Sequence, residues 1–445
     1  MKLWEKDIPL NKAVEEFTIG RDPEFDLLLA PFDVIGSMAH AHMLRKIGIL
    51  SDGEYKALHQ SLKQIHRNIE SDKFAIEEGV EDVHSQVEQM LTKDLGDIGK
   101  KIHTGRSRND QVLVDLKLFF REEIRKIFQA KSELFDLLLA QADQYEDDLL
   151  PGYTHMQAAM PSSFGLWFSA YAENLIDDAH LWSAVLQIVN LNPLGSGAGY
   201  GSSLPLDRSD TTELLGFSDL NYNVVHAQMG RGRTELFLSF AIAATASNLS
   251  KLAMDVCMYN SQDLAFLTLE DAFTTGSSIM PHKKNPDVFE LIRSRCNALT
   301  QLPGVVAGMV GHLPSGYHRD LQLTKEYLIP ALDQLFNCLQ MTHLALSNVQ
   351  VQKDILDQDK YLAIFSVETV NEMVAKGVPF REAYKKVAAD IEQGVLKKPD
   401  QLKHTHEGSL GNLCLDEIRA KFERVQKSFD FSYVAKVKEL LNKTS

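Results

Sequence analysis

Residues 233–275 read RTELFLSFAIAATASNLSKLAMDVCMYNSQDLAFLTLEDAFTT and contain neither glycine nor proline. A run of 43 residues without a helix breaker predicts one long helix that ends at Gly276. Residues 236–246 are apolar almost all round, so we expect other helices to surround this part. The stretch therefore predicts a protein built on long, buried helices.

The segment that follows breaks the helical pattern at Gly276, Pro281 and Pro286. Between these breakers lie two hydroxyl groups and two ammonium groups, those of Ser277, Ser278, Lys283 and Lys284. A basic loop rich in glycine and serine is most often a solvated connection between helices. It is also suited to be a mobile lid that closes on an anion.

Other stretches show the same long helical pattern. Residues 109–150 contain no glycine or proline, and either Asn109 or Asp110 is suited to cap a helix there. Apolar residues recur in this stretch at steps of three and four, as in the seam of a helix bundle: Leu113, Leu116, Phe120, Ile124 and Ile127. Residues 166–192 and a run from Pro330 to about residue 349 are similar. Strand signals are few, so the predicted class is all-α.

The length of these helices also predicts an oligomer. A helix of about 40 residues is roughly 60 Å long, at about 1.5 Å per residue. Apolar helices of that length extend beyond the core of one subunit, so we expect a bundle shared between copies of the chain.

A chain of 445 residues should divide into two or three domains. We expect an N-terminal helical domain over residues 1–106, a central long-helix bundle over 107–350 and a small helical domain over 351–445. Residues 81–95 form an amphipathic pattern in the first domain. His84 lies off its apolar stripe, which leaves it as either a surface residue or a site residue.

The composition excludes several classes of protein. A net charge of −15 argues against a nucleic-acid scaffold. We expect no membrane span, because no run of 18 apolar residues occurs, and no signal peptide at the N-terminus. Four scattered cysteines fit reduced thiols in a cytoplasm. Basic residues gather at 100–108, 283–284 and 319–325, which predicts small anionic substrates.

Two further motifs do not predict ligand sites. The glycine-rich residues 195–203 have the spacing GxGxGxG, and no strand pattern precedes them, so they do not form a dinucleotide fingerprint. The His-x-His pairs at 40–42 and 404–406 have no cysteine or carboxylate at ligand spacing, so neither predicts a metal site.

The order of residues in the broken segment is more specific than its composition. Residues 276–286, GSSIMPHKKNP, closely resemble the signature of the fumarase/aspartase superfamily, whose members cleave a C–N or C–O bond and release fumarate. Four stretches resemble the argininosuccinate lyase branch of that superfamily: EDVH at 81–84, HTGRSRNDQ at 103–111, GYTHMQ at 152–157 and PSGYHRDLQLTK at 314–325. The likeness extends over about residues 31–390.

Elimination beside a carboxylate requires a base, cations that hold a dianionic intermediate, and an acid for the leaving group. Ser277 is a candidate base only as an alkoxide, which needs positive potential such as that of Lys283. Imidazoles titrate near neutral pH, so His155 is the candidate acid. Glu290 is a candidate carboxylate to orient that imidazole.

The resemblance implies the same roles for these four residues, with Lys283 and Asn285 holding the carboxylate that gains charge. It implies substrate contacts from Ser37, Arg108, Asn109, Thr154, Tyr317, Gln322 and Lys325. It further implies cleavage of argininosuccinate into arginine and fumarate, the last step of arginine biosynthesis, with no metal or organic cofactor. The implied assembly is a cytoplasmic homotetramer with a twenty-helix core, in which each active site draws on three subunits.

This chain departs from the family pattern at three places. Trp4-Glu-Lys-Asp-Ile8 stands where the family has Trp-Gly-Gly-Arg-Phe, and His282 replaces the usual glutamine of the lid. Gly230-Arg231-Gly232 stands where the family has Asp-Arg-Asp, which makes Arg231 a second-rank candidate for substrate contact.

Two alternatives remain open at this point. Another fumarate-releasing enzyme, such as an adenylosuccinate lyase, would need a purine and phosphate pocket, for which the sequence has no further motif. A non-catalytic structural protein, as lens crystallins of this family are, would be favoured by missing site residues. His155, Ser277, Lys283 and Glu290 are all present.

Overall fold

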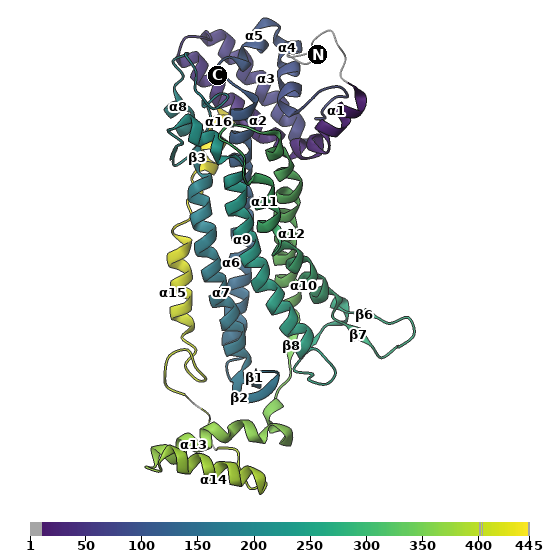
Figure 1. Ribbon diagram of the computed structural model, residues 1–445, viewed down its shortest axis with the longest axis vertical. Coiled ribbons are helices and arrows are strands. Elements are labelled where there is room, and N and C mark those ends of the chain that lie inside the picture. The colour runs from purple at the N-terminus through teal and green to yellow at the C-terminus, as the bar shows by residue number, and fades with distance from the viewer. Residues whose placement is uncertain (1–10, 400–401, 403, 444–445) are drawn as a thin grey trace.

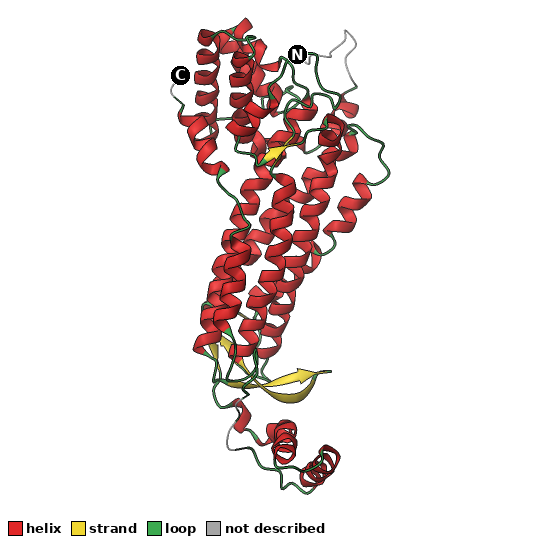
Figure 2. Cartoon of the chain, turned by 90° about the vertical axis from the view of Figure 1, so that its left-hand side faces the viewer, coloured by secondary structure: helices red, strands yellow, loops and turns green. Residues whose placement is uncertain are grey.

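The computed structural model describes residues 11–399, 402 and 404–443. The departure at Trp4 therefore lies outside the described residues. Helices dominate the described chain, and its strands form four two-stranded sheets, so the predicted all-α class is confirmed. Long helices lie side by side in an elongated bundle, with groups of shorter helices at both ends (Figures 1 and 2).

The bundle consists of α6 (Arg108–Gln144), α7 (Phe164–Val189), α9 (Val224–Tyr259), α10 (Asp287–Leu299), α11 (Leu302–Val310) and α12 (Thr324–Leu346). The predicted seam of α6, from Leu113 to Ile127, is buried in the core. Helix α6 begins with a capping box in which the Ser107 side chain and Asp110 satisfy each other's backbone N–H groups. Asp110 thus contributes to the cap, but the N-cap residue itself is Ser107.

The single long helix predicted up to Gly276 is wrong at both of its ends. Helix α9 begins earlier, at Val224, contains a kink at Arg231 and Gly232, and ends at Tyr259. The chain then forms β5 (Leu267–Leu269), which pairs with β8 (Val349–Val351), and the 3-10 helix η2 (Asp271–Phe273). Phe266 and Leu267 are buried in the main core beside the ends of the bundle helices. Tertiary burial therefore determines this segment, although no glycine or proline interrupts it.

Shorter helices pack around a second core at one end of the bundle. They are α2 (Asp22–Lys46), α3 (Asp52–Glu70), α4 (Val83–Leu95), α5 (Asp97–Lys100), η1 (Lys101–His103), α8 (Arg208–Leu214) and α16 (Tyr433–Asn442). Helix α1 (Lys12–Ile19) lies at the same end of the bundle (Figure 1). Helix α2 joins the two cores, because Phe25 and Leu29 belong to the bundle core and Val34 and Met38 to the second one. A short parallel pair, β3 (Leu191–Asn192) and β4 (Asp219–Leu220), lies near this end.

The opposite end carries the hairpin of β1 (Leu149–Thr154) and β2 (Gln157–Ser163) and the ribbon of β6 (Thr275–Gly276) and β7 (Lys284–Asn285) (Figure 1). Beyond the hairpin lie η4 (Ile355–Asp357), η5 (Asp359–Phe365), α13 (Ser366–Ala375) and α14 (Phe380–Glu392). Helix α15 (Leu415–Gln426) runs back along α7, and α16 packs against α2 and α8. The three-domain division stays a prediction; within residues 351–445, α13 and α14 share a small apolar cluster of their own.

Two helices have the length and hydropathy of a membrane span, Asp22–Lys46 and Val224–Tyr259. Of the most apolar window in each, 78% and 56% is buried inside the fold. Packing within the protein therefore accounts for most of the apolar surface of α2, whereas α9 keeps a large uncovered part.

Candidate active site

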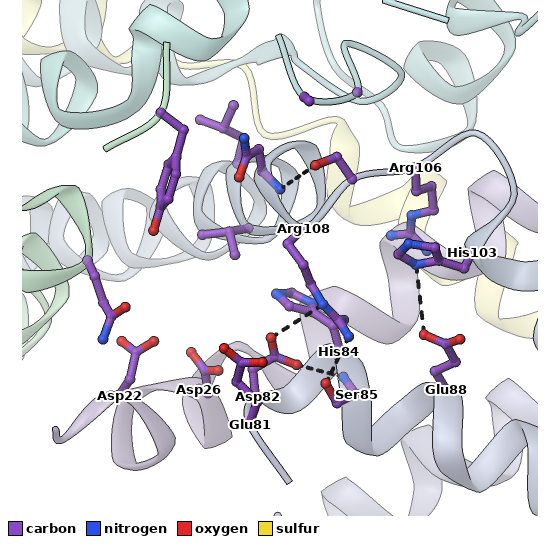
Figure 3. A pocket seen from close by; sticks show the side chains of 18 of the residues that line it. Asp22, Asp26, Glu81, Asp82, His84, Ser85, Glu88, His103, Arg106 and Arg108 are labelled. Carbon is purple, nitrogen blue, oxygen red and sulfur yellow. Dashed lines mark hydrogen bonds and ion pairs between the residues drawn. The ribbon is translucent and has the colours of Figure 1, made fainter. Parts of the chain in front are cut away.

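A cavity of about 1100 Å³ opens where α2, α4, the start of α6, the kink of α9 and the 3-10 helix η3 (Arg319–Leu323) meet (Figure 3). Five of the twelve predicted site residues line it: Arg108, Asn109, Tyr317, Gln322 and Lys325. The second-rank candidate Arg231 lines it as well. Segments far apart in the sequence thus converge on one cavity.

The wall at the start of α6 is suited to bind an anion. Arg108 is the first residue of a 37-residue helix, and the N-terminal end of a helix carries positive partial charge. Its Nη2 donates a hydrogen bond to Ser85 Oγ at 2.8 Å, and its Nε lies 3.4 Å from Asp82 Oδ2. Its Nη1 is buried and has no hydrogen-bond partner in the described chain. This guanidinium therefore keeps one unsatisfied donor nitrogen at the cavity wall.

A buried histidine lies beside this wall. His84 Nδ1 lies 2.8 Å from Asp33 Oδ1 and 3.5 Å from Asp115 Oδ2, and all three side chains are buried. Burial opposes the charged imidazole, but the carboxylates of Asp33, Asp82 and Asp115 outweigh burial and raise the pKa of His84 to about 9. His84, which the sequence left open, is thus a cationic residue of the cavity wall.

The same three side chains are a possible metal-ligand set, because their ligand atoms lie within 4.8 Å of one another. Protein cations already surround the carboxylates, however. Burial opposes the ionised form of Asp33, but the charges of His84, Arg106 and Arg108 outweigh it and lower its pKa. The cluster is therefore better described as an internal ion network than as a cation site.

Ser37 is not part of the cavity wall. Its side chain is buried in α2, and its Oγ accepts a hydrogen bond from Arg106 Nη1 at 2.8 Å. Arg106 does line the cavity. Within this chain, Ser37 supports a wall residue from behind, and its direct contact with substrate stays a prediction.

An acidic row of side chains begins beside Arg108 and forms another part of the cavity wall. Figure 3 shows Asp22, Asp26, Glu81 and Asp82 in a row along it. Lys325 Nζ lies 2.6 Å from Asp22 Oδ1 and 2.7 Å from Asp26 Oδ1. The cation expected for the substrate is therefore already neutralised by two carboxylates that the sequence analysis had not singled out.

Thr154 and His155 lie at the far end of the molecule. Helix α6 runs from Arg108 to Gln144 and is roughly 55 Å long at about 1.5 Å per residue. The hairpin follows its C-terminal end, so it lies at the other end of the bundle from the cavity (Figure 1). One chain alone does not bring His155 to the cavity.

The hairpin turn holds His155 in an unusual conformation. His155 and Met156 are exposed, and their φ angles are +52° and +62°. Two left-handed residues between paired strands form a type I′ turn, which normally contains asparagine and glycine. Each such residue without glycine costs on the order of 1–2 kcal/mol. Strain of this kind is common at functional sites.

The predicted lid projects from the bundle as the β6–β7 ribbon (Figure 1). It carries Ser277, Lys283 and Asn285, and Glu290 follows in the first turn of α10. Ser277 Oγ accepts hydrogen bonds from the backbone N–H groups of Met280 at 3.1 Å and Ile279 at 3.4 Å. Two N–H donors stabilise negative charge on this oxygen, as an alkoxide base requires.

Glu290 does not contact the predicted acid within one chain. Its carboxylate lies 3.8 Å from Arg293 Nη2, and no hydrogen bond or ion pair joins it to His155 in the described part of the chain. Eleven of the twelve predicted residues thus form three groups: the cavity, the hairpin, and the lid with α10. Only Ser37 lies outside all three.

The comparisons with known proteins agree with this geometry. A family model described as Lyase matches residues 1–300. An argininosuccinate lyase from Bacteroides thetaiotaomicron is 58% identical over 97% of this chain and 96% of its own length. One from Stenotrophomonas maltophilia is 37% identical over 95% of this chain and 98% of its own length.

Solved structures support the fold independently. That of EDDS lyase in complex with formate has a TM-score of 0.77, covers 98% of this chain and 94% of its own, and is 20% identical. At that identity the likeness concerns the fold alone. The identities to the curated relatives extend over nearly the whole length of both chains, and the lid, hairpin and cavity motifs are all present. The chain therefore belongs to the argininosuccinate lyase family of fumarate-releasing lyases.

Proposed function

We propose that this protein cleaves argininosuccinate into arginine and fumarate. The observation that carries the proposal is 58% identity, over nearly full length, to a relative named argininosuccinate lyase. The cavity supports it with a cationic wall at Arg108 and an acidic side at Asp22, because argininosuccinate carries both carboxylates and cationic groups.

In the proposed reaction, the Ser277 alkoxide removes a proton from the succinate carbon next to a carboxylate. The electron pair moves into that carboxylate, which becomes a dianionic intermediate held by Lys283 and Asn285. The electron pair of the dianion then forms the C=C bond of fumarate as the C–N bond breaks. The electrons of the C–N bond pass to the guanidine nitrogen, and His155 gives that nitrogen a proton. Glu290 keeps the imidazole charged and oriented. The steps use protein side chains alone.

We also propose that each active site is assembled from several subunits of a homotetramer. The three groups of site residues support this, since α6 separates the hairpin from the cavity by roughly 55 Å. Exposed apolar side chains on the bundle helices support it too: Phe240 and Met254 of α9, Leu291 of α10 and Leu344 of α12 are 47–55% exposed in one chain. Contact with other copies would cover them.

The cytoplasm is the proposed location. Cys257, Cys296, Cys338 and Cys414 are free thiols in the structure, which fits a reducing compartment. Cell fractionation followed by an immunoblot tests this.

The reaction is tested by incubating the purified protein with argininosuccinate and measuring arginine and fumarate. We expect equal amounts of both products, and no cleavage of adenylosuccinate in a parallel assay. Turnover of adenylosuccinate alone would contradict the substrate. Absence of any turnover in a folded tetramer would favour a structural role.

A further inference from the structure

The acidic side of the cavity contains one carboxylate that is arranged differently from its neighbours. Lys325 and Asp26 have side chains that are only 3% exposed, whereas the side chain of Asp22 is 18% exposed. Asp26 uses one oxygen for Lys325 Nζ and accepts a hydrogen bond from Val83 N with the other, at 3.3 Å. Asp26 is therefore committed to the protein interior.

Asp22 has only one of its oxygens occupied. Its Oδ1 pairs with Lys325 Nζ at 2.6 Å, and its Oδ2 has no hydrogen bond or ion pair within the described residues. Burial raises the pKa of Asp22, and the ammonium group of Lys325 opposes that shift. The residue lines the cavity at the start of α2 (Figure 3). It thus offers a fixed carboxylate oxygen to a ligand.

The other two acidic residues of this row are already in use. Asp82 accepts a hydrogen bond from Ser85 N at 2.7 Å and lies 3.4 Å from Arg108 Nε. Glu81 lies 3.9 Å from Arg319 Nη2. A cationic ligand group that enters this side therefore finds its acceptor at Asp22.

Argininosuccinate has two cationic groups, a guanidinium and an α-ammonium. The guanidine nitrogen is the leaving group, so it must lie at the reaction centre, beside the proposed acid and base. The α-ammonium lies at the other end of a methylene chain, next to a carboxylate. Tyr317 also lines the cavity, and its phenol is a donor suited to that carboxylate, whereas the Gln322 amide already donates to the carbonyls of Thr18 and Ile19. An amino-acid end needs such donors and an anionic acceptor together.

We propose that Asp22, held in place by Lys325, binds the α-ammonium group of the arginine half of the substrate. Asp22 is then a residue that determines specificity for an amino acid over other guanidine compounds. The inference rests on the proposed function, because it takes argininosuccinate as the substrate.

The test uses the reverse reaction of the purified full-length protein, with arginine and fumarate as substrates. Arginine is compared with 5-guanidinopentanoate, which lacks only the α-ammonium group. Loss of a charge-assisted hydrogen bond should raise the KM of Asp22→Asn for arginine about 10- to 100-fold. The KM for fumarate and for 5-guanidinopentanoate should stay close to wild type, so the preference for arginine should largely disappear.

Asp52→Asn is the matched control. Asp52 is also the first residue of a helix, α3, but its side chain is 82% exposed and outside the cavity lining. It should change neither KM. Asp22→Ser also removes the charge and gives the same measurement if Asp22→Asn is unstable.

Two results would overturn the inference. One is an unchanged preference for arginine in Asp22→Asn. The other is an equal loss of affinity for both guanidine compounds, which would mean that Asp22 serves only to hold Lys325. A wild-type protein that forms no argininosuccinate would instead refute the proposed function, and the two failures are therefore distinguishable.

Discussion

Lys283 and Lys284 are neighbours in the β6–β7 loop, yet their surroundings differ. The ammonium group of Lys284 pairs with Asp271, whereas no ion pair to Lys283 exists in the described structure. If Lys283 holds the charged intermediate, Lys283→Ala should lower kcat by about 10²–10³ while the fold survives. Lys284→Ala is the control and should lower kcat far less. Steady-state kinetics decides, and a near-normal kcat for Lys283→Ala would identify it as an ordinary surface lysine.

His84 predicts how stability depends on pH. Its pKa is about 9 in the folded protein and near 6.5 in an unfolded chain. The charged form is favoured by folding, so this stabilisation is complete below pH 6.5 and is lost as pH rises to 9. The total is on the order of 3 kcal/mol.

Burial and the charges of Arg108 and Arg106 lower the pKa of His103 to about 4. The contribution of His103 to the pH dependence of stability therefore falls below pH 6.5, outside the range of His84. Burial lowers the pKa of Lys117 to about 7 and that of Lys131 to about 8, so both lysines act in this range with the opposite sign.

The measurement is therefore the difference in free energy of unfolding between the wild type and His84→Gln, which should decrease as pH rises from 6.5 to 9 in urea unfolding. His226 is exposed, so the control His226→Gln should keep the same pH dependence of stability as the wild type. A difference between the wild type and His84→Gln that does not change across this range would exclude the charged His84.

Sequence reasoning found the residues that lie in motifs and missed those that only folding brings together. Arg108, Asn109, Tyr317 and Gln322 were predicted and line the cavity. Asp22 was missed, because its role depends on Lys325, which is 303 positions away in the sequence. The hydrogen bond that Arg106 donates to Ser37 was also missed, since nothing in the local sequence of Ser37 indicates it.

At the scale of elements, the kink of α9 determines where the long helix meets the cavity. Gly232 has a φ of +80°, and a Cβ atom there would lie 2.7 Å from Val310 Cγ1 and 2.8 Å from Leu321 Cδ2. A Cβ atom added at Gly230, two residues earlier, would meet no other atom within 4 Å in the described structure. The two glycines of one motif therefore have different structural requirements.

Gly232→Ala should destabilise the protein by about 2 kcal/mol, through the left-handed backbone and the close contacts. Gly230→Ala should be neutral or stabilising by up to about 1 kcal/mol, because alanine favours a helix. Denaturant unfolding of both variants measures this. Equal stability of the two variants would mean that the kink is not a fixed feature of α9.

Helix periodicity predicted α7 to within three residues at each end and the start of α6 to within one, because their apolar stripes are continuous, but it placed the end of α6 six residues too late. It failed for residues 260–275, where Phe266 and Leu269 are buried without forming a helix. Absence of glycine and proline permits a helix but does not require one. Pairing of β5 with β8 closes the end of the bundle, and this depends on residues about 80 positions later.

At the scale of the whole molecule, one chain contains every proposed site residue but does not contain an assembled site. Helix α9 continues for 28 residues from Gly232 to Tyr259, roughly 40 Å, before the chain enters the lid region. The lid and the hairpin are thus both separated from the cavity of their own chain by the length of a bundle helix.

This separation makes a prediction about mixtures of inactive variants. Arg108→Met should disable the cavity of its own subunit and His155→Asn the hairpin of its own subunit, so each purified variant alone should have almost no activity. If the variants are unfolded together and refolded in equal amounts, some sites combine a native cavity from one subunit with a native hairpin from another. With random assembly these make up about a quarter of the sites, so about a quarter of wild-type activity should return.

The control is a single chain that carries both substitutions, refolded with wild type. In that mixture a site is intact only when both of its contributors are wild type, which is again about a quarter of the sites. In a second control, native wild-type tetramers are mixed with the double variant without unfolding. Because the subunits do not exchange, the wild-type activity should stay unchanged. Light scattering should show tetramers in every sample. If the two single variants regain no activity in mixed tetramers, the cavity and the hairpin of one site must come from the same subunit. The length of α6 would then have to be bridged within one chain, which contradicts the geometry of the bundle.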